Sequence, residues 1–385
     1  MGRRHRRPAL RIGSPPLTDA QIAVAFGGPS PEHDVSILTG LQAARELHDA
    51  GRAVTGVYWT GTGDFYAVPA TLEAESFLEG VPRGAEPLRL SAGEEGGFVG
   101  TGRMGRPRRL DVDVVVNCCH GGPGEDGTLQ AAMDLAGVAY TGPTVAGAAL
   151  GMDKLAFAGV VAAADLPCLA RSPLHPGADV DFSGPYIVKP RFGGSSIGVE
   201  VVEDTETALA RLDANPHLRG GAVVEPFRPD LYDLNVAVRS WPALEVSAVE
   251  RPLKSNSRSE ILGYADKYVG GQGMASAPRE LPAELAPAVE AELRRQAAVV
   301  SALAQLRGVA RIDFLSDGES LFVNEINTIP GSLARYLWVD PPLPFRSLLD
   351  DLIEEARRRP ARRYSTVGAD GTVLRGAGAI AAKLT

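Results

Sequence analysis

The chain has 385 residues, of which 44% are hydrophobic and 22% charged, an ordinary globular composition that excludes a disordered chain and predicts two or three domains. Without the five arginines of the first eleven residues, 34 basic residues face 47 acidic ones, a net charge of −13. This charge argues against nucleic acid as a partner, because phosphate contacts supply most of that affinity. Three cysteines cannot form a disulfide framework, and no apolar run suits a membrane helix, so we expect a cytoplasmic protein without membrane insertion.

Residues 21–150 have the pattern of a doubly wound N-terminal α/β domain. Short apolar runs alternate with helix-like stretches there, as a βαβ arrangement requires. We predict strands at 21–26, 53–59, 111–118 and 138–141, and helices at 35–50 and 127–136. The stretch 100–105 spells G-x-G-x-x-G, but a strand follows it instead of a helix, so it is predicted to be a surface turn. Residues 1–20 lack the apolar core of a secretion signal and are predicted to be a disordered basic extension.

The character of the sequence changes near residue 151. We predict helices at 154–164, 282–306 and 348–359, and strands at 186–189, 199–203, 222–226, 234–238, 244–249, 309–315 and 321–324. These elements divide into a central domain (151–226), a C-terminal domain (227–360) and a tail (361–385). A polar, glycine-dotted loop at 253–280 is long enough to be a functional lid.

The two strands near residues 311 and 325 carry side chains with metal-binding chemistry. Residues two apart on a strand face the same side, so Arg311 shares a face with Asp313, and Glu325 shares one with Asn327. Carboxylate and amide oxygens suit Mg²⁺ (or Mn²⁺), which usually adds water and substrate phosphate as ligands. The alternative is a charged, exposed hairpin face, and the apolar residues between these positions weigh against it.

Three loops could bind anions or other polar ligands. Lys189 ends an apolar strand, where a charge without an anionic partner is costly, and the glycine- and serine-rich loop 193–198 offers backbone N–H groups to an anion. The alternative for this loop is a simple hairpin connection. Loops 27–36 and 119–128 each follow a strand of the first domain, at the edge where open α/β sheets bind ligands. Helix capping is the alternative for both.

Together these stretches resemble the D-alanine–D-alanine ligases of the ATP-grasp superfamily over roughly residues 21–358. The matching stretches, in the family's order, are GGPSPEHDVS, HGGPGEDGTLQ, YTGP, MDK, IVKPRFGGSSIGV, DKY, RIDF and NEINTIPG. The resemblance implies an ATP-grasp fold of three α/β domains, with ATP held between the central and C-terminal domains. It also implies that a carboxylate attacks the γ-phosphate and that an amino group captures the acyl phosphate. Amino-acid substrates, a place in peptidoglycan biosynthesis and a homodimer are further expectations.

The resemblance also implies roles for individual residues. ATP would be bound by Lys154, Lys189, Gly193, Gly194, Ser196, Glu225, Asp233 and Lys267. The metal would be held by Asp313, Glu325 and Asn327, and the catalytic groups would be Glu32, Ser195, Tyr268, Arg311 and the Gly331 N–H. Glu32 would meet the ammonium of the first amino acid, and Arg311 with Gly331 would stabilise the tetrahedral oxyanion.

One segment departs from the family pattern. After Asn-x-x-Pro-Gly, Leu333 replaces the usual threonine, and Tyr336 replaces a small serine that meets the second substrate's carboxylate. The acceptor is therefore either D-alanine or another amino or hydroxy acid of a specialised pathway. We expect substrate contacts from His120, Arg335, Tyr336 and Leu337. A non-catalytic nucleotide-binding relative is disfavoured, because the lysine, arginine and metal-site residues above are all present.

Overall fold

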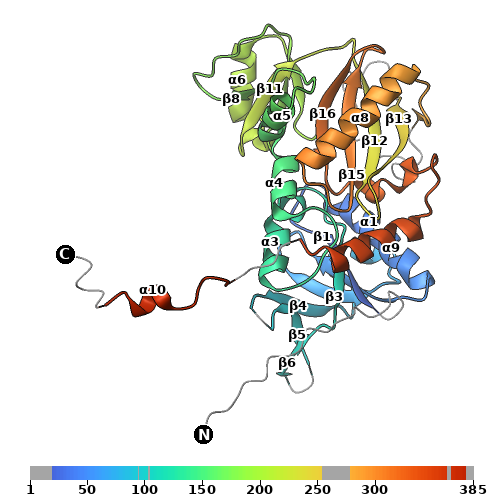
Figure 1. Ribbon diagram of the computed structural model, residues 1–385, viewed down its shortest axis with the longest axis vertical. Helices are drawn as coiled ribbons and strands as arrows, with labels where there is room; N and C mark the ends of the chain where they lie inside the picture. Colours follow the sequence, from blue (N-terminus) through green and yellow to red (C-terminus); the bar gives the residue numbers. More distant parts are fainter. Residues whose placement is uncertain (1–19, 94, 103–104, 254–277, 362–365, 379–385) are drawn as a thin grey trace.

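Three β-sheets organise the chain (Figure 1). The computed structural model describes residues 20–93, 95–102, 105–253, 278–361 and 366–378. The predicted extension, almost all of the predicted lid and part of the predicted tail lie outside these residues. A mixed α/β architecture with several sheets agrees with the expected fold class.

The first sheet has seven strands in the order β6-β5-β4-β3-β2-β1-β7. Strand β1 (Gln21–Gly27) pairs in parallel with β2 (Ala53–Trp59) and β7 (Val114–Asn117), as the sequence predicts. No strand is predicted between residues 60 and 110, where antiparallel strands extend the sheet. These strands are β3 (Phe65–Pro69), β4 (Glu86–Ser91), β5 (Gly97–Thr101) and β6 (Pro107–Arg109). The G-x-G-x-x-G stretch starts in β5 and ends two residues before β6, and the Gly102 N–H donates to the Arg106 carbonyl oxygen between the two strands.

Helices follow the parallel strands and place polar loops at their carboxyl ends. They are α1 (His33–Asp49), α2 (Gly122–Glu125), α3 (Thr128–Leu135) and α4 (Val145–Met152), with a 3₁₀ turn η2 (Ala74–Phe77). The predicted strand at 138–141 is a single parallel bridge between Val115 and Tyr140.

The central sheet has the order β10-β9-β11-β8. Its strands are β8 (Ser172–Leu174), β9 (Tyr186–Pro190), β10 (Glu200–Val202) and β11 (Ala222–Pro226). Between β10 and β11 the chain forms helix α6 (Thr205–Ala214), which packs on the sheet, and the 3₁₀ turn η4 (Pro216–Leu218). The third sheet has the order β14-β13-β12-β15-β16. Its strands are β12 (Tyr232–Arg239), β13 (Glu245–Pro252), β14 (Arg279–Glu280), β15 (Val309–Ser316) and β16 (Leu321–Asn327). Helices α5 (Lys154–Ala163) and α8 (Pro287–Leu303) pack on this third sheet.

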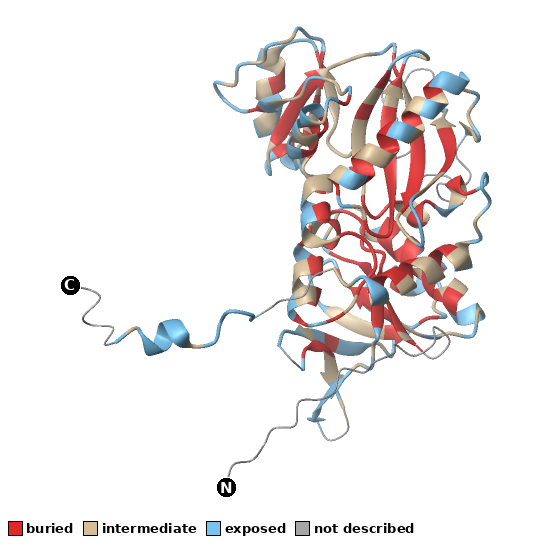
Figure 2. Cartoon of the chain, in the orientation of Figure 1, coloured by how far each residue is buried: buried red, intermediate tan, exposed pale blue. Residues whose placement is uncertain are grey.

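The last helices of the chain return to the first sheet. Helix α9 (Phe345–Arg358) is where the sequence predicts a helix, but its leucines share one buried cluster with Ile22 and Val116 of β1 and β7. The 3₁₀ segment η6 (Gly331–Leu337) belongs to the same cluster through Leu333. Figure 2 shows this buried material as red ribbon between the upper and lower sheets. Residues near 330 are thereby held against the N-terminal domain. A short helix α10 (Thr372–Arg375) lies beyond it.

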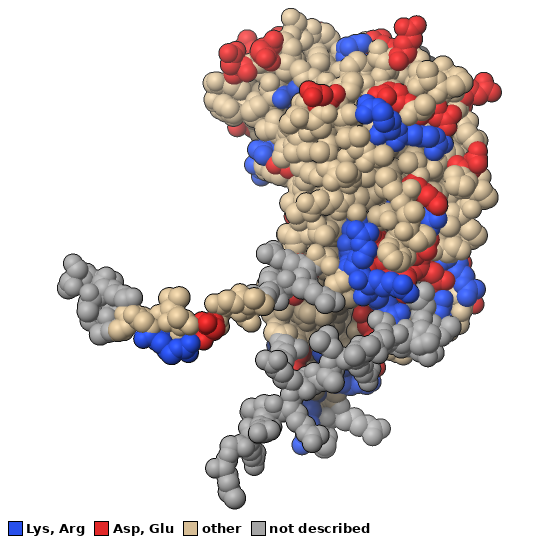
Figure 3. Space-filling model, in the orientation of Figure 1, with Lys and Arg blue, Asp and Glu red and all other residues tan. Residues whose placement is uncertain are grey.

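The surface carries both signs of charge. On the face seen in Figure 3, basic side chains lie among acidic ones and form no broad surface of one sign. In the described part of the chain, none of the helices combines the length and apolar character needed to cross a membrane.

Candidate active site

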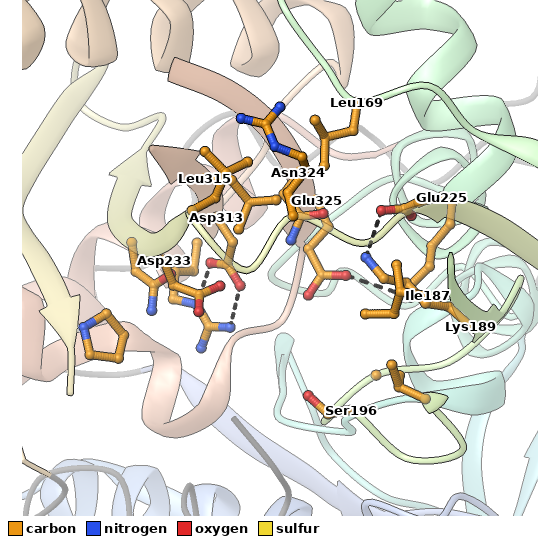
Figure 4. Close-up of a pocket in the computed structure, with 18 of the residues that line it drawn as sticks. Leu169, Ile187, Lys189, Ser196, Glu225, Asp233, Asp313, Leu315, Asn324 and Glu325 are labelled. Atoms are coloured by element: carbon orange, nitrogen blue, oxygen red, sulfur yellow. Dashed lines mark hydrogen bonds and ion pairs between the residues drawn. The ribbon is translucent and has the colours of Figure 1, made fainter. Parts of the chain in front are cut away.

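A cavity of about 190 Å³ lies between the central and third sheets. Figure 4 shows Lys189 and Glu225 on one side of it and Asp313 and Glu325 on the other, with Ser196 approaching from the 193–198 loop. The predicted residues that line it are Lys154, Lys189, Gly193, Gly194, Ser196, Glu225, Asp233, Arg311, Asp313 and Glu325. A smaller pocket of about 40 Å³ shares some of these residues and adds Glu32, His120, Ser195, Asn327 and Gly331.

Strands β15 and β16 bring the predicted metal-site residues into register. Asp313 is paired with Glu325, and Arg311 with Asn327. The Arg311 guanidinium donates to both oxygens of Asp313, at 2.6 and 2.7 Å, and the Asn327 amide donates to Asp313 Oδ2 at 3.1 Å. In the described residues, no group of three or more His, Cys, Asp or Glu side chains is arranged to hold a metal ion. Two carboxylates and one amide oxygen nevertheless form a donor set of the kind that Mg²⁺ prefers.

A buried carboxylate holds two cations at the opposite side of the cavity. Glu225 is 1% exposed; its oxygens lie 2.8 Å from Lys189 Nζ and 2.6 Å from Arg171 Nε. Burial by itself would raise the pKa of Glu225, but the two cations outweigh it and hold the pKa below its usual value. Arg171 also donates to the Lys154 carbonyl oxygen at 2.6 Å. Arg171 therefore ties helix α5 to the central sheet, a role that no motif in the sequence predicts.

The loop after β9 closes over a second lysine. Lys154 Nζ donates to the Gly193 carbonyl at 2.5 Å and lies 3.6 Å from Glu325 Oε2. Ser195 and Ser196 have φ of 53° and 57°, a left-handed conformation that non-glycine residues rarely adopt. Such conformations persist where the surroundings fix them, and they concentrate at ligand-binding sites. Ser196 lines the larger pocket and Ser195 the smaller one.

Glu32 meets this loop from the N-terminal domain. The Ser195 hydroxyl donates to a Glu32 oxygen across 163 positions of sequence. A Cβ atom at Gly121 or Gly194 would lie 2.4 or 3.0 Å from Glu32 Oε2, so a side chain at Gly121 would displace the carboxylate and one at Gly194 would crowd it. The structure thus brings the predicted Glu32, Ser195 and Gly194 together.

His120 lines the small pocket, but both of its ring nitrogens are bonded to protein atoms. Nδ1 lies 2.7 Å from the Ile329 carbonyl oxygen, and Nε2 lies 2.8 Å from Thr39 Oγ1. Burial lowers the pKa of His120, which favours the neutral ring. Both ring nitrogens are therefore occupied by contacts with the chain itself, and the expected contact between His120 and a substrate stays a prediction.

Glu125 is a buried residue of the loop 119–128, for which the sequence left ligand binding and helix capping open. It accepts from the Ile329 N–H at 2.8 Å and from the Gly121 N–H at 3.0 Å. Burial, reinforced by the Glu32 carboxylate, raises the pKa of Glu125 to about 7. Its partner segment leads into η6, where Ser332, Leu333 and Ala334 have φ of 49–52°. A left-handed turn costs roughly 1–2 kcal/mol per residue, so this turn needs support from its surroundings.

The predicted acceptor residues Arg335, Tyr336 and Leu337 are not among the residues that line the two pockets. Arg335 is exposed and places its guanidinium 5.3 Å from the Phe345 ring centre, and Leu337 is fully buried in the core with α9. Neither lines the cavity, because the left-handed turn directs them away from it. Tyr336 instead lies under the Arg279 guanidinium, 4.8 Å from its ring centre. Burial, with Glu250 nearby, raises the pKa of the Tyr336 phenol.

Arg279 and Glu250 are cavity-lining residues that sequence reasoning missed. They form an ion pair of 2.8 Å, and the Asn235 amide donates to the other Glu250 oxygen at 3.2 Å. Burial raises the pKa of Glu250 despite this pairing. The Tyr336 hydroxyl oxygen is buried and has no hydrogen-bond partner among the described residues. Lys267 and Tyr268 lie outside the described residues, so their expected roles stay predictions.

Comparison with known proteins gives consistent family matches. A family model described as D-ala D-ala ligase N-terminus matches residues 21–143, and one described as D-ala D-ala ligase C-terminus matches residues 167–354. A D-alanine--D-alanine ligase of Bradyrhizobium sp. (strain ORS 278) is 32% identical over 358 residues, which cover 89% of this chain and 96% of the relative. The enzyme of the same name from Methylobacterium sp. (strain 4-46) is 33% identical and covers 90% and 93%.

Solved structures share the fold. The D-alanine-D-alanine ligase from Coxiella burnetii has a TM-score of 0.72 at 24% identity, covering 93% of this chain and 98% of that one. VanG D-Ala:D-Ser ligase from Enterococcus faecalis has a TM-score of 0.70 at 24% identity, covering 88% and 99%. At this level of identity the likeness establishes a common fold and nothing about the substrate.

Proposed function

This chain belongs to the D-alanine–D-alanine ligase family, and we propose that it joins two D-alanine molecules with cleavage of ATP to ADP and phosphate, for peptidoglycan biosynthesis. The observation that carries the proposal is the cavity between two sheets, with Lys189 and Lys154 on one side and Asp313 and Glu325 in register on the other. Cations facing carboxylates across a cleft suit a polyphosphate with its counter-ion. The curated relatives reported above bear one name, and none of them supports a different acceptor.

The ATP and metal assignments are part of this proposal. Lys154 and Lys189 would bind phosphate oxygens, the backbone of the 193–198 loop would cover them, and Glu225 with Asp233 would hold the nucleoside end of ATP. Asp313, Glu325 and Asn327 would hold Mg²⁺ or Mn²⁺, whose charge would neutralise the transferring phosphate. Lys189 would exchange its contact with Glu225 for a phosphate oxygen. No protein nucleophile is needed, because positioning and charge supply most of the catalysis.

The first amino acid would lie in the small pocket. Glu32 is the carboxylate there that would meet its ammonium, with Ser195 fixing that carboxylate. Arg311 and the Gly331 N–H would donate to the oxyanion that forms when the acceptor amine attacks the acyl phosphate. Release of phosphate then leaves the dipeptide.

We propose that Arg279 and Tyr336, in place of Arg335, recognise the acceptor's carboxylate. Arg279 is held by the buried Glu250 and by stacking on Tyr336, so its guanidinium is oriented before a ligand arrives. The buried Tyr336 hydroxyl would gain an acceptor for its proton. Both side chains lie near Arg311, where the acceptor amine must arrive.

The overall proposal is tested by measuring phosphate release with D- and L-amino acids, singly and in pairs, with mass spectrometry of the product. We expect D-alanyl-D-alanine to form fastest. Faster product formation with D-serine or a hydroxy acid as acceptor would refute the acceptor assignment. The absence of ATP cleavage with every amino acid would refute the proposed ligase activity.

The acceptor contact is tested by comparing D-alanine with D-alaninamide, which lacks the carboxylate charge. Arg279→Ala should raise the KM for acceptor D-alanine by about 10- to 150-fold, the equivalent of a charged hydrogen bond of ~1.5–3 kcal/mol, and should leave D-alaninamide almost unaffected. Arg335→Ala is the matched control and should behave like the wild type. An equal loss for both acceptors would show that Arg279 is structural. A homodimer stays a prediction, which light scattering would check.

A further inference from the structure

The backbone of residues 328–332 connects the metal-site strand β16 to the left-handed turn. Asn327 ends that strand, and Gly331, whose N–H is assigned to the oxyanion, begins η6. The backbone between and after them is held by side chains that come from the N-terminal domain. The holding groups belong to the loop after β7 and to helix α1, more than 200 positions away in sequence.

Both polar backbone groups of Ile329 are bonded to this loop. Its N–H donates to Glu125 Oε1 at 2.8 Å, and its carbonyl accepts from His120 Nδ1 at 2.7 Å. The second Glu125 oxygen accepts from the Gly121 N–H at 3.0 Å, which fixes the carboxylate. Ile329 is 3% exposed, so water cannot replace these partners.

A second attachment lies on the other side of Gly331. The Ser332 N–H donates to Thr39 Oγ1 at 3.1 Å, and the same hydroxyl lies 2.8 Å from His120 Nε2. A carbonyl only accepts, so His120 carries its proton on Nδ1. In the neutral ring Nε2 then accepts from the Thr39 hydroxyl, whose oxygen accepts from the Ser332 N–H. Each hydrogen bond therefore determines the direction of the next.

We propose that His120, Thr39 and Glu125 form a positioning clamp, which holds the 329–332 backbone so that the Gly331 N–H points at the reacting centre. This inference rests on the proposed function. It assigns His120 to the enzyme's own backbone instead of to a substrate, and it gives a catalytic effect to Thr39, a helix residue that does not line either pocket. The left-handed residues 332–334 explain the need, because such a turn holds its shape only when both sides are fixed.

Thr39 offers the sharpest test, because valine has nearly its shape without the hydroxyl. In Thr39→Val we expect kcat to fall by about 10- to 100-fold, the range that a displacement of roughly 1 Å produces at a reacting centre. The KM values for ATP and D-alanine should stay near those of the wild type, because neither ligand touches Thr39. Thr39→Ser keeps the hydroxyl and should recover most of the turnover.

His120 provides a second pair of variants. Asparagine places its amide N–H near the position of Nδ1 and can still donate to Ile329, whereas glutamine reaches only towards Thr39. We therefore expect His120→Asn to retain more turnover than His120→Gln. Equal kcat in Thr39→Val and wild type, a loss confined to thermal stability, or an effect on KM alone would each overturn the clamp.

A spectroscopic measurement separates the clamp from the proposed function. Long-range ¹H–¹⁵N spectra of the full chain distinguish the histidine tautomers, and His120→Asn identifies the relevant signal among six histidines. We expect a neutral ring with its proton on Nδ1, and a change of that signal in Thr39→Val. A proton on Nε2 would refute the clamp even if the ligase activity is confirmed. If the wild type forms no dipeptide, the proposed function is refuted, but the position of the His120 proton still tests the hydrogen bonds of the clamp.

Discussion

Replacing Glu225 by glutamine tests whether the cavity is built around a buried charge. The change keeps the shape of the side chain but leaves Lys189 and Arg171 without a counter-ion. The three side chains are 11%, 4% and 1% exposed for Lys189, Arg171 and Glu225, so water can screen the two cations very little. Removing one partner of a buried ion pair costs about 3–5 kcal/mol.

This free energy converts into a large thermal shift. At roughly 2–4 °C per kcal/mol for a unit of this size, the midpoint of unfolding should fall by about 6–20 °C. Differential scanning calorimetry of the whole chain measures it. Glu292→Gln is the matched control, since Glu292 pairs with Arg295 on the outer face of α8, where both side chains are 41% or more exposed. Exposed pairs contribute little, so this variant should unfold almost like the wild type.

The pH dependence checks the cause. Since the folded pKa of Glu225 is lowered, its stabilising contribution is present above the ordinary pKa of a glutamate and is lost as pH falls through the folded pKa. The difference between wild type and Glu225→Gln should therefore shrink on acidification. Equal thermal shifts in the Glu225 and Glu292 variants, or a Glu225 effect that does not change with pH, would refute the reasoning.

Three further outcomes are expected. Asp313→Ala or Glu325→Ala should lower turnover by orders of magnitude while the circular dichroism spectrum is unchanged, and near-normal activity at limiting Mg²⁺ would contradict the metal assignment. Lys189→Ala should raise the KM for ATP far more than that for D-alanine in steady-state kinetics, and an unaltered KM for ATP would make this lysine structural. The pKa of Glu125 is raised to about 7, so its stabilising effect is present below the ordinary glutamate pKa and is lost as pH rises through 7. Glu125→Gln should consequently make the unfolding temperature less dependent on pH between about pH 5 and pH 8, and an unchanged slope would show that Glu125 does not titrate as described.

Local features of the site could be read directly from the sequence. The alternation on β15 and β16 put Arg311 beside Asp313 and Glu325 beside Asn327, and the structure pairs these strands in register. This works because a strand's two-residue period depends only on the backbone. The loop after Lys189 could also be recognised, because its glycines and serines are adjacent in the chain.

The antiparallel half of the first sheet was not predicted. Its strands at 65–109 are short, and β6 is exposed throughout, so no clear alternation of apolar residues marks them. The helix α9 shows the opposite case. Its apolar spacing predicted a helix, but spacing reports only that one face is buried and does not identify the partner. Only the tertiary structure placed that face on the first sheet.

The choice between Arg279 and Arg335 shows where sequence reasoning stops. Arg335 lies next to Tyr336 in the chain and was therefore the expected partner, yet the left-handed turn points it at Phe345. Arg279 reaches Tyr336 from strand β14, 57 positions earlier in the chain. His120 likewise meets Ile329 across 209 positions. The sequence by itself determined the two lysines, the metal-site side chains and the glycine- and serine-rich loop, because those groups lie in short local motifs. The tertiary structure alone decided which groups line the cavity and which hold the backbone, because that depends on contacts between distant segments.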